Sequence, residues 1–160
     1  MDFDRLYRLQ SARFRRRRME AFARALAITL AARVLDVGGT PFNWQLSGVV
    51  ADVTLANLEE PREPLPAGFR FEVSDARDLP HPDRSFDVCV SNSVIEHLGT
   101  WENQQRMASE VRRVADRLWV QTPARGFPVE PHLIGLNLSR LPRRWQRRLV
   151  RVTSVWGVAR

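Results

Sequence analysis

Short apolar segments, each followed by glycine or a polar residue, recur along the first three quarters of the chain. They occupy residues 33–37, 52–58, 69–73, 86–91 and 117–121. Each has the length and the apolar or alternating pattern of a strand, and the intervening segments are long enough to cross from one strand to the next. Parallel strands joined by such crossovers form a doubly wound α/β sheet. We therefore expect a mostly parallel sheet of about five strands with flanking helices.

The helical pattern is clearest in two segments. Apolar residues recur at spacings of three to five over residues 3–32, and again on one face of residues 104–114. Residues 141–152 read as a basic amphipathic helix. A chain of 160 residues suits one domain. We expect a single domain made of an N-terminal helical segment (1–32), a ligand-binding core (33–123), and a loop with the basic helix on the substrate side (124–160).

Composition narrows the classes of function. The hydrophobic share of 44% is enough for a packed core, and no apolar run is long enough for a membrane span. The N-terminus has no signal-peptide pattern, so we expect a cytoplasmic protein. The single cysteine, Cys89, excludes an intrachain disulfide, and no His/Cys/Asp spacing indicates a metal site.

The net charge of +7 comes entirely from arginine, with no lysine in the sequence. Arginine suits phosphate and nucleic acids. A complete absence of lysine, however, is typical of a genome-wide bias in composition, so we do not expect nucleic acid as the main partner. The run Arg15–Arg18 has two interpretations: a solvated helix face, or a clamp for an acidic substrate or a membrane surface.

Glycine or a polar residue stands at or just beyond the end of four of the predicted strands. Gly38 and Gly39 follow the first, Asn57 ends the second, Asp75 follows the third and Asn92 follows the fourth. In doubly wound sheets, ligands bind beyond the carboxyl ends of the strands. Glycine lets the backbone approach a ligand closely, and an acceptor about twenty residues further on is typical of ribose recognition. The sequence therefore predicts a nucleotide-type site at this edge.

Four motifs together resemble a known family, the class I methyltransferases that use S-adenosylmethionine, and especially their small-molecule "type 11" branch. The motifs are VLDVGG (34–39), VTLANLE (53–59), SDARDLPHPDRSFDVCVSNSVIEHL (74–98) and WVQTP (119–123). The resemblance covers roughly residues 15–135. It implies a Rossmann-like fold, S-adenosylmethionine as the cofactor, and methyl transfer to a small-molecule acceptor.

The resemblance assigns cofactor-binding roles to the first two strand ends. Gly38 and Gly39 would lie against the methionyl part and the ribose. Asp36 would fix the glycine loop or reach the cofactor's ammonium group. Asn57 would hold the ribose hydroxyls.

The third and fourth strand ends complete the implied site. Asp75 would accept a hydrogen bond from the adenine amine, and the backbone of Ala76 would meet a ring nitrogen. Asn92 would line the floor near the sulfonium. His97 would act as a base or contact the substrate, although its position also fits, and rather better, a partly buried histidine that supports the turn. We interpret Glu96 as the capping-box partner of Ser93.

The sequence departs from the family in three ways. Thr40 and Phe42 stand where the family has further glycines, and Asn57 stands where it usually has an acidic residue. The family's final antiparallel strand pair is missing or incomplete, which would leave the fifth strand as a bare edge. Truncation, the basic helix, or a homodimer or partner chain would each account for that edge. The alternative function is therefore a catalytically inactive or truncated scaffold or regulatory subunit. A nicotinamide-binding domain would need the spaced GxGxxG turn, which is absent.

Overall fold

The computed structural model describes residues 3–61, 64–123, 129–130, 135–136, 141–142, 144–145 and 148–149. The chain divides into two compact units, Met1–Thr122 and Pro123–Arg160. The first unit contains the whole parallel sheet and the helices that flank it. No helix in the described part of the chain is long and apolar enough to cross a membrane.

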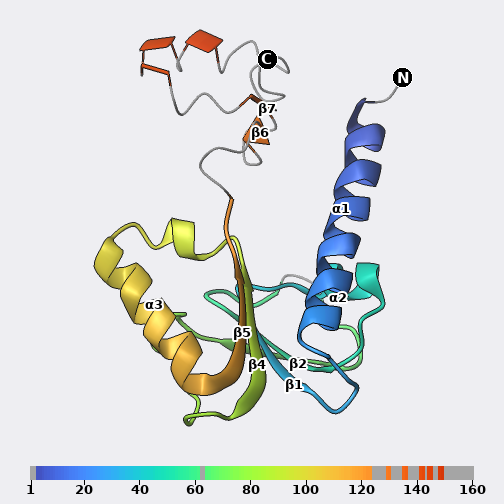
Figure 1. The fold of residues 1–160 in the computed structure, drawn as a ribbon, viewed down its shortest axis with the longest axis vertical. Helices are drawn as coiled ribbons and strands as arrows, with labels where there is room; N and C mark the ends of the chain where they lie inside the picture. Colours follow the sequence, from blue (N-terminus) through green and yellow to red (C-terminus); the bar gives the residue numbers. More distant parts are fainter. Residues whose placement is uncertain are drawn as a thin grey trace. The chain divides into compact units, whose positions relative to one another are not determined.

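Five parallel strands form the sheet of the first unit (Figure 1). They are β1 (Arg33–Val37), β2 (Asp52–Asn57), β3 (Phe69–Val73), β4 (Phe86–Asn92) and β5 (Ala115–Gln121). Their order is β3-β2-β1-β4-β5, and every neighbouring pair is parallel. The strand order reverses between β1 and β4, so the carboxyl ends of these two strands flank the switch point at which such sheets bind ligands. The expected five-stranded α/β fold is confirmed.

Helices cover both faces of this sheet. They are α1 (Phe3–Ala25), α2 (Pro41–Ser47), α3 (Trp101–Val114) and the short 3-10 helix η1 (Ile95–His97). The first helix ends at Ala25 instead of continuing to residue 32, because Ala27 adopts a left-handed backbone with φ of 45°. Leu30, an apolar residue near the end of the expected helix, is consequently 74% exposed.

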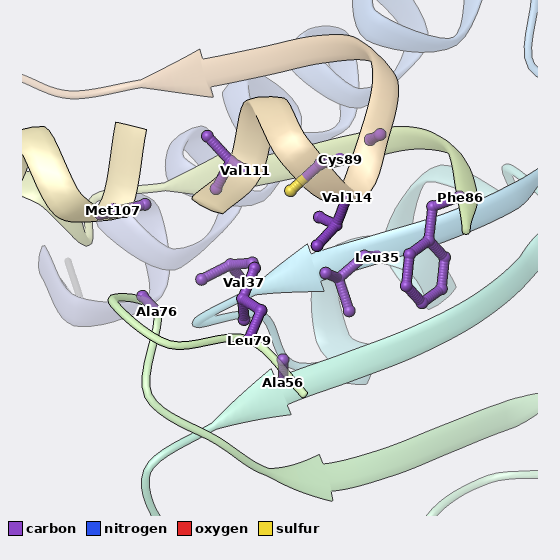
Figure 2. Packing of buried hydrophobic residues seen from close by; sticks show 11 residues of the cluster. Leu35, Val37, Ala56, Ala76, Leu79, Phe86, Cys89, Met107, Val111 and Val114 are labelled. Atoms are coloured by element: carbon purple, nitrogen blue, oxygen red, sulfur yellow. The ribbon is translucent and has the colours of Figure 1, made fainter. Parts of the chain in front are cut away.

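The core between the sheet and α3 contains the apolar face that the spacing over residues 104–114 predicted. Met107, Val111 and Val114 of α3 are buried against Leu35 and other strand residues (Figure 2). Cys89 lies within this cluster with no exposed surface, and burial raises the pKa of its thiol to about 12. Cys89 is therefore a core-packing residue.

The opposite face of the sheet packs against α1 and α2. The ring of Phe22 in α1 meets Trp44 of α2 edge-on, with the ring centroids 5.8 Å apart, and lies at the same distance from Trp119 of β5. Phe22 and Trp44 are almost completely buried. This aromatic cluster fixes α2, and with it the loop that follows β1, to the sheet.

The interpretation of Ser93 and Glu96 as a capping box is wrong. Ser93 adopts a left-handed backbone with φ of 59°, and the N-cap position of η1 is taken by Val94, which makes no side-chain cap hydrogen bond. The carboxylate of Glu96 instead accepts a hydrogen bond from Thr122 Oγ1 at 3.0 Å. The following helix, α3, is capped by Thr100, whose hydroxyl accepts from the backbone N–H of Asn103. A contact from the end of β5, distant in sequence, thus replaced the local cap.

The second unit contains two short strands that the sequence pattern did not indicate. They are β6 (Val129–Glu130) and β7 (Gly135–Leu136), which pair antiparallel in a sheet of their own. The basic helix expected over residues 141–152 falls largely outside the described residues. The proposal that this segment or a partner chain covers β5 stays a prediction.

Candidate functional site

A cavity of about 250 Å³ opens at the carboxyl ends of the strands of the first unit. Five of the residues singled out in the sequence lie on its wall. They are Gly38, Asn57, Asp75, Ala76 and His97. The strand-end residues of β1 and β2 and those that follow β3 and β4 therefore meet at one place, as the parallel topology requires.

Asn57 ends β2 at the rim of this cavity. Its Oδ1 accepts the backbone N–H of Leu58 at 3.1 Å, and its Nδ2 lies 3.5 Å from the carbonyl oxygen of Gly39. The side chain is thus held between its own strand end and the glycine loop. A second cavity of about 420 Å³ lies beside the first and shares Asn57 and Leu58 with it. Gly39 lines this second cavity.

Asp75 follows β3 and is held by Arg77. The guanidinium of Arg77 donates to both carboxylate oxygens, at 2.6 to 3.1 Å, and its backbone N–H donates to Oδ1 at 2.9 Å. These hydrogen bonds lower the pKa of Asp75 to about 2. The group is therefore an ionised acceptor at any physiological pH, fixed in orientation by a neighbour two residues away.

Asp36 lies beneath the glycine loop, away from the cavity wall. Its carboxylate is buried, and its Oδ2 accepts a hydrogen bond from Trp44 Nε1 at 2.7 Å. Burial raises the pKa of Asp36 to about 7, an effect that the Trp44 hydrogen bond partly opposes. Of the two roles that the resemblance implied, this geometry matches the one in which Asp36 fixes the loop.

Both glycines of the loop lie against side chains of the protein itself. A Cβ added to Gly38 would stand 2.2 Å from Val94 Cγ2, and one added to Gly39 would stand 2.0 Å from the Asp36 carboxylate. Gly38 also has a φ of +75°, which favours glycine. Glycine is thus required here by the packing of Val94 and Asp36, independently of any ligand.

The turn after β4 forms the opposite wall of the cavity. Ser93, Val94, His97 and Leu98 line it. The backbone N–H of Ser93 donates to the carbonyl of Gln121 at 2.9 Å, so the turn is tied to the end of β5. His97 is exposed at the cavity, which does not fit the interpretation of a partly buried supporting histidine.

Asn92, like Asp36 and Gly39, is a predicted site residue that does not line this cavity. It ends β4 beside Gln121, and its Oδ1 is buried with no hydrogen-bond partner among the residues that the structure describes. Within the described residues, no group of three His, Cys, Asp or Glu side chains is placed to hold a metal ion.

Sequence reasoning missed three residues that shape the site. Trp44 holds Asp36, Arg77 fixes Asp75, and Val94 packs on Gly38. Only the contact between Arg77 and Asp75 could have been predicted from neighbouring residues, since an aspartate often accepts a hydrogen bond from the backbone N–H two residues later. The other two depend on how α2 and the turn after β4 fold back onto the loop.

The fold is that of a Rossmann-like α/β domain, and the strand-end cavity lies at its switch point. Residues 44–117 match the sequence model of the family described as "Methyltransferase domain". A comparison with curated proteins found no match. The family match agrees with the resemblance to methyltransferases that the motifs indicated. The solved structures below share the fold.

Several solved structures share the fold at low sequence identity. A protein described as a methyltransferase from an antibiotic biosynthesis pathway of Anabaena variabilis has a TM-score of 0.61 and 17% identity, over 84% of this chain and 59% of its own. The [4+2]-cyclase SpnF has a TM-score of 0.52 and 22% identity, over 66% of this chain and 43% of its own. An S-adenosylmethionine-dependent methyltransferase of Aquifex aeolicus has a TM-score of 0.52 and 16% identity, over 82% of this chain and 75% of its own. The chain spans about half the length of the first two.

Proposed function

We propose that this chain binds S-adenosylmethionine in the strand-end cavity and transfers its methyl group to a small-molecule acceptor. The observation that carries the proposal is the meeting of Gly38, Asn57 and Asp75, from three separate strand ends, on one cavity wall. The family match over residues 44–117 supports the same cofactor.

The residues on the wall fit the chemistry of this cofactor. Asp75 is an ionised acceptor, suited to the exocyclic amine of adenine, and the backbone of Ala76 follows it directly. The amide of Asn57 is suited to one ribose hydroxyl. When bound, S-adenosylmethionine supplies an electrophilic methyl group, so the protein's task is to bind and align. His97 is placed to take a proton from an acceptor that must lose one.

A non-catalytic scaffold is the second candidate. The observation that favours it is that Val94 and Asp36 fill the space beside the two glycines, where a methyltransferase needs room for its cofactor. Under this alternative the site would bind the cofactor weakly and no methyl transfer would follow.

Calorimetric titration of the 160-residue chain with S-adenosylhomocysteine tests the cofactor assignment. We expect saturable binding, weakened about tenfold by Asp75→Ala and by Asn57→Ala, because each loses a hydrogen bond to the ligand. Asp116→Asn is the matched control, since Asp116 lies near the amino end of β5, at the opposite edge of the sheet. Absence of binding heat in the wild type would contradict the proposal.

A second measurement separates the enzyme from the scaffold. If S-adenosylhomocysteine binds, transfer of a labelled methyl group is then measured with a panel of small acceptors. Transfer that His97→Ala reduces, at unchanged affinity for S-adenosylhomocysteine, supports catalysis with His97 as the base. Binding without transfer to any acceptor of the panel supports the scaffold.

A further inference from the structure

The second cavity, of about 420 Å³, has walls that are largely apolar. They come from separate elements: Pro41 begins α2, Leu55 lies in β2 and Phe71 lies in β3. Leu65, from the segment that joins β2 to β3, lines the cavity as well. Leu55, Leu65 and Phe71 pack in the core cluster that contains the buried Phe22. The core therefore fixes these walls, and the cavity has a size within the roughly 300–1,000 Å³ of small-molecule sites.

The connection from β2 to β3 explains why a hollow remains at this place. Its described residues, 58–61 and 64–68, contain no helix, whereas α2 joins β1 to β2 and α3 joins β4 to β5. A doubly wound sheet buries its apolar faces against such crossover helices. Here a loop covers Leu55 and Phe71 instead, and it leaves room beside them.

The exposed edge of the cavity is acidic. Glu59 and Glu60 follow β2, line the cavity and have exposed side chains. Within the described part of the chain, neither takes part in a hydrogen bond or an ion pair, and no basic residue lines the cavity. Both carboxylates are therefore available to a ligand, in a chain whose net charge is +7. Such an edge favours a cation and disfavours an anion.

We propose that the second cavity binds a small molecule that joins an apolar ring to an ammonium group. The ring would lie between Pro41, Leu65 and Phe71, and the ammonium group would stand beside Glu59 and Glu60. Exposed carboxylates alone hold a cation weakly, so the apolar walls supply most of the affinity and the carboxylates decide the sign of the charge. This inference goes beyond the proposed function, because the cofactor assignment uses the other cavity.

Calorimetric titration of the full chain with 4-phenylbutylamine tests the proposal against three matched probes. The alcohol 4-phenylbutan-1-ol lacks the charge, 4-phenylbutyrate reverses it, and butylamine lacks the ring. We expect 4-phenylbutylamine to bind about tenfold more tightly than the alcohol, because it gains two exposed ion pairs, and 4-phenylbutyrate to bind more weakly than the alcohol. Butylamine should bind at least about tenfold more weakly than 4-phenylbutylamine, because it buries no ring.

Replacement of both carboxylates tests their role. The double variant Glu59→Gln with Glu60→Gln should lower the affinity for 4-phenylbutylamine about tenfold, to that for the alcohol, and leave the affinity for the alcohol unchanged. Glu102→Gln is the matched control and should bind as the wild type does. Glu102 is also an exposed glutamate, but it lies in α3, which packs on the opposite face of the sheet.

Filling the cavity tests where the probe binds. Leu65 is half-buried and lines the second cavity but not the first. Leu65→Trp should abolish binding of both 4-phenylbutylamine and the alcohol, because the larger ring takes the place of the ligand. Its unfolding temperature should be no lower than that of the wild type, since the added ring occupies empty space. If Leu65→Trp fails to fold, the double glutamine variant decides the proposal alone, because both of its substitutions are at exposed positions.

Four results would overturn the proposal. The wild type might give no binding heat with 4-phenylbutylamine, or bind it no more tightly than the alcohol, in which case the carboxylates select no cation. Butylamine might bind as tightly as 4-phenylbutylamine, which would reduce the effect to attraction by surface charge. Affinity for 4-phenylbutylamine that is unchanged in both Leu65→Trp and the double glutamine variant would place the probe outside this cavity.

Discussion

Stability is expected to fall by roughly 4 kcal/mol as the pH rises from about 4 to about 7, on account of Asp36 alone. Burial raises the pKa of this carboxyl from 3.8 to about 7 in the folded protein. Between these values the folded state holds a proton that the unfolded state has released, so a higher pH favours unfolding. Below the window both states are protonated, and above it both are ionised. Chemical denaturation of the wild type and Asp36→Asn across this range measures the difference.

Two variants control this prediction. Trp44→Phe removes the hydrogen bond that lowers the Asp36 pKa, so the loss of stability should extend to higher pH. Asp87 should change stability with pH in the opposite direction. Arg33 lowers the pKa of Asp87, so the stability that Asp87 contributes is lost as the pH falls, and Asp87→Asn should remove that loss. If the free energy of unfolding of the wild type and of Asp36→Asn changed with pH in the same way, the pKa of Asp36 would not be raised by folding, and the prediction would be wrong.

The sheet was predictable because its signals are local and redundant. Each strand is a short apolar run with a polar or glycine end, and parallel topology alone brings those ends to one edge. The cavity wall of Gly38, Asn57 and Asp75 follows from that rule. A single left-handed residue, Ala27, was enough to end α1 early, and alanine gives no warning of it.

Contacts between distant elements decided the remaining features. Ser93 and Glu96 have the spacing of a capping box, yet Glu96 is held by Thr122, just beyond β5. Arg15 and Arg18 read as part of a solvated run, yet they lie on the inner face of α1. In each case the side chain's surroundings come from an element whose position depends on the whole fold. Sequence spacing therefore located the site but not the contacts that shape it.

Gly38→Ala is expected to destabilise the protein by roughly 2–5 kcal/mol. A left-handed backbone costs a residue with a Cβ about 1–2 kcal/mol, and overpacking costs about 1–3 kcal/mol. Both apply here, because φ is +75° and the new Cβ would stand 2.2 Å from Val94 Cγ2. Urea unfolding gives the value. In a Val94→Ala background the clash disappears, so the cost of Gly38→Ala should fall to that of the backbone alone.

The same double-mutant cycle decides why glycine stands at this position. If Gly38 serves only to accommodate Val94, the double variant should bind S-adenosylhomocysteine as well as Val94→Ala does. If the backbone must also approach a ligand closely, the methyl group added by Gly38→Ala remains in the cavity wall, and affinity should stay at least about tenfold weaker after stability has recovered. We expect the second result, because Gly38 lines the cavity as well as contacting Val94. Recovery of affinity together with stability would make this glycine a feature of the protein's own packing and would weaken the case for a bound cofactor.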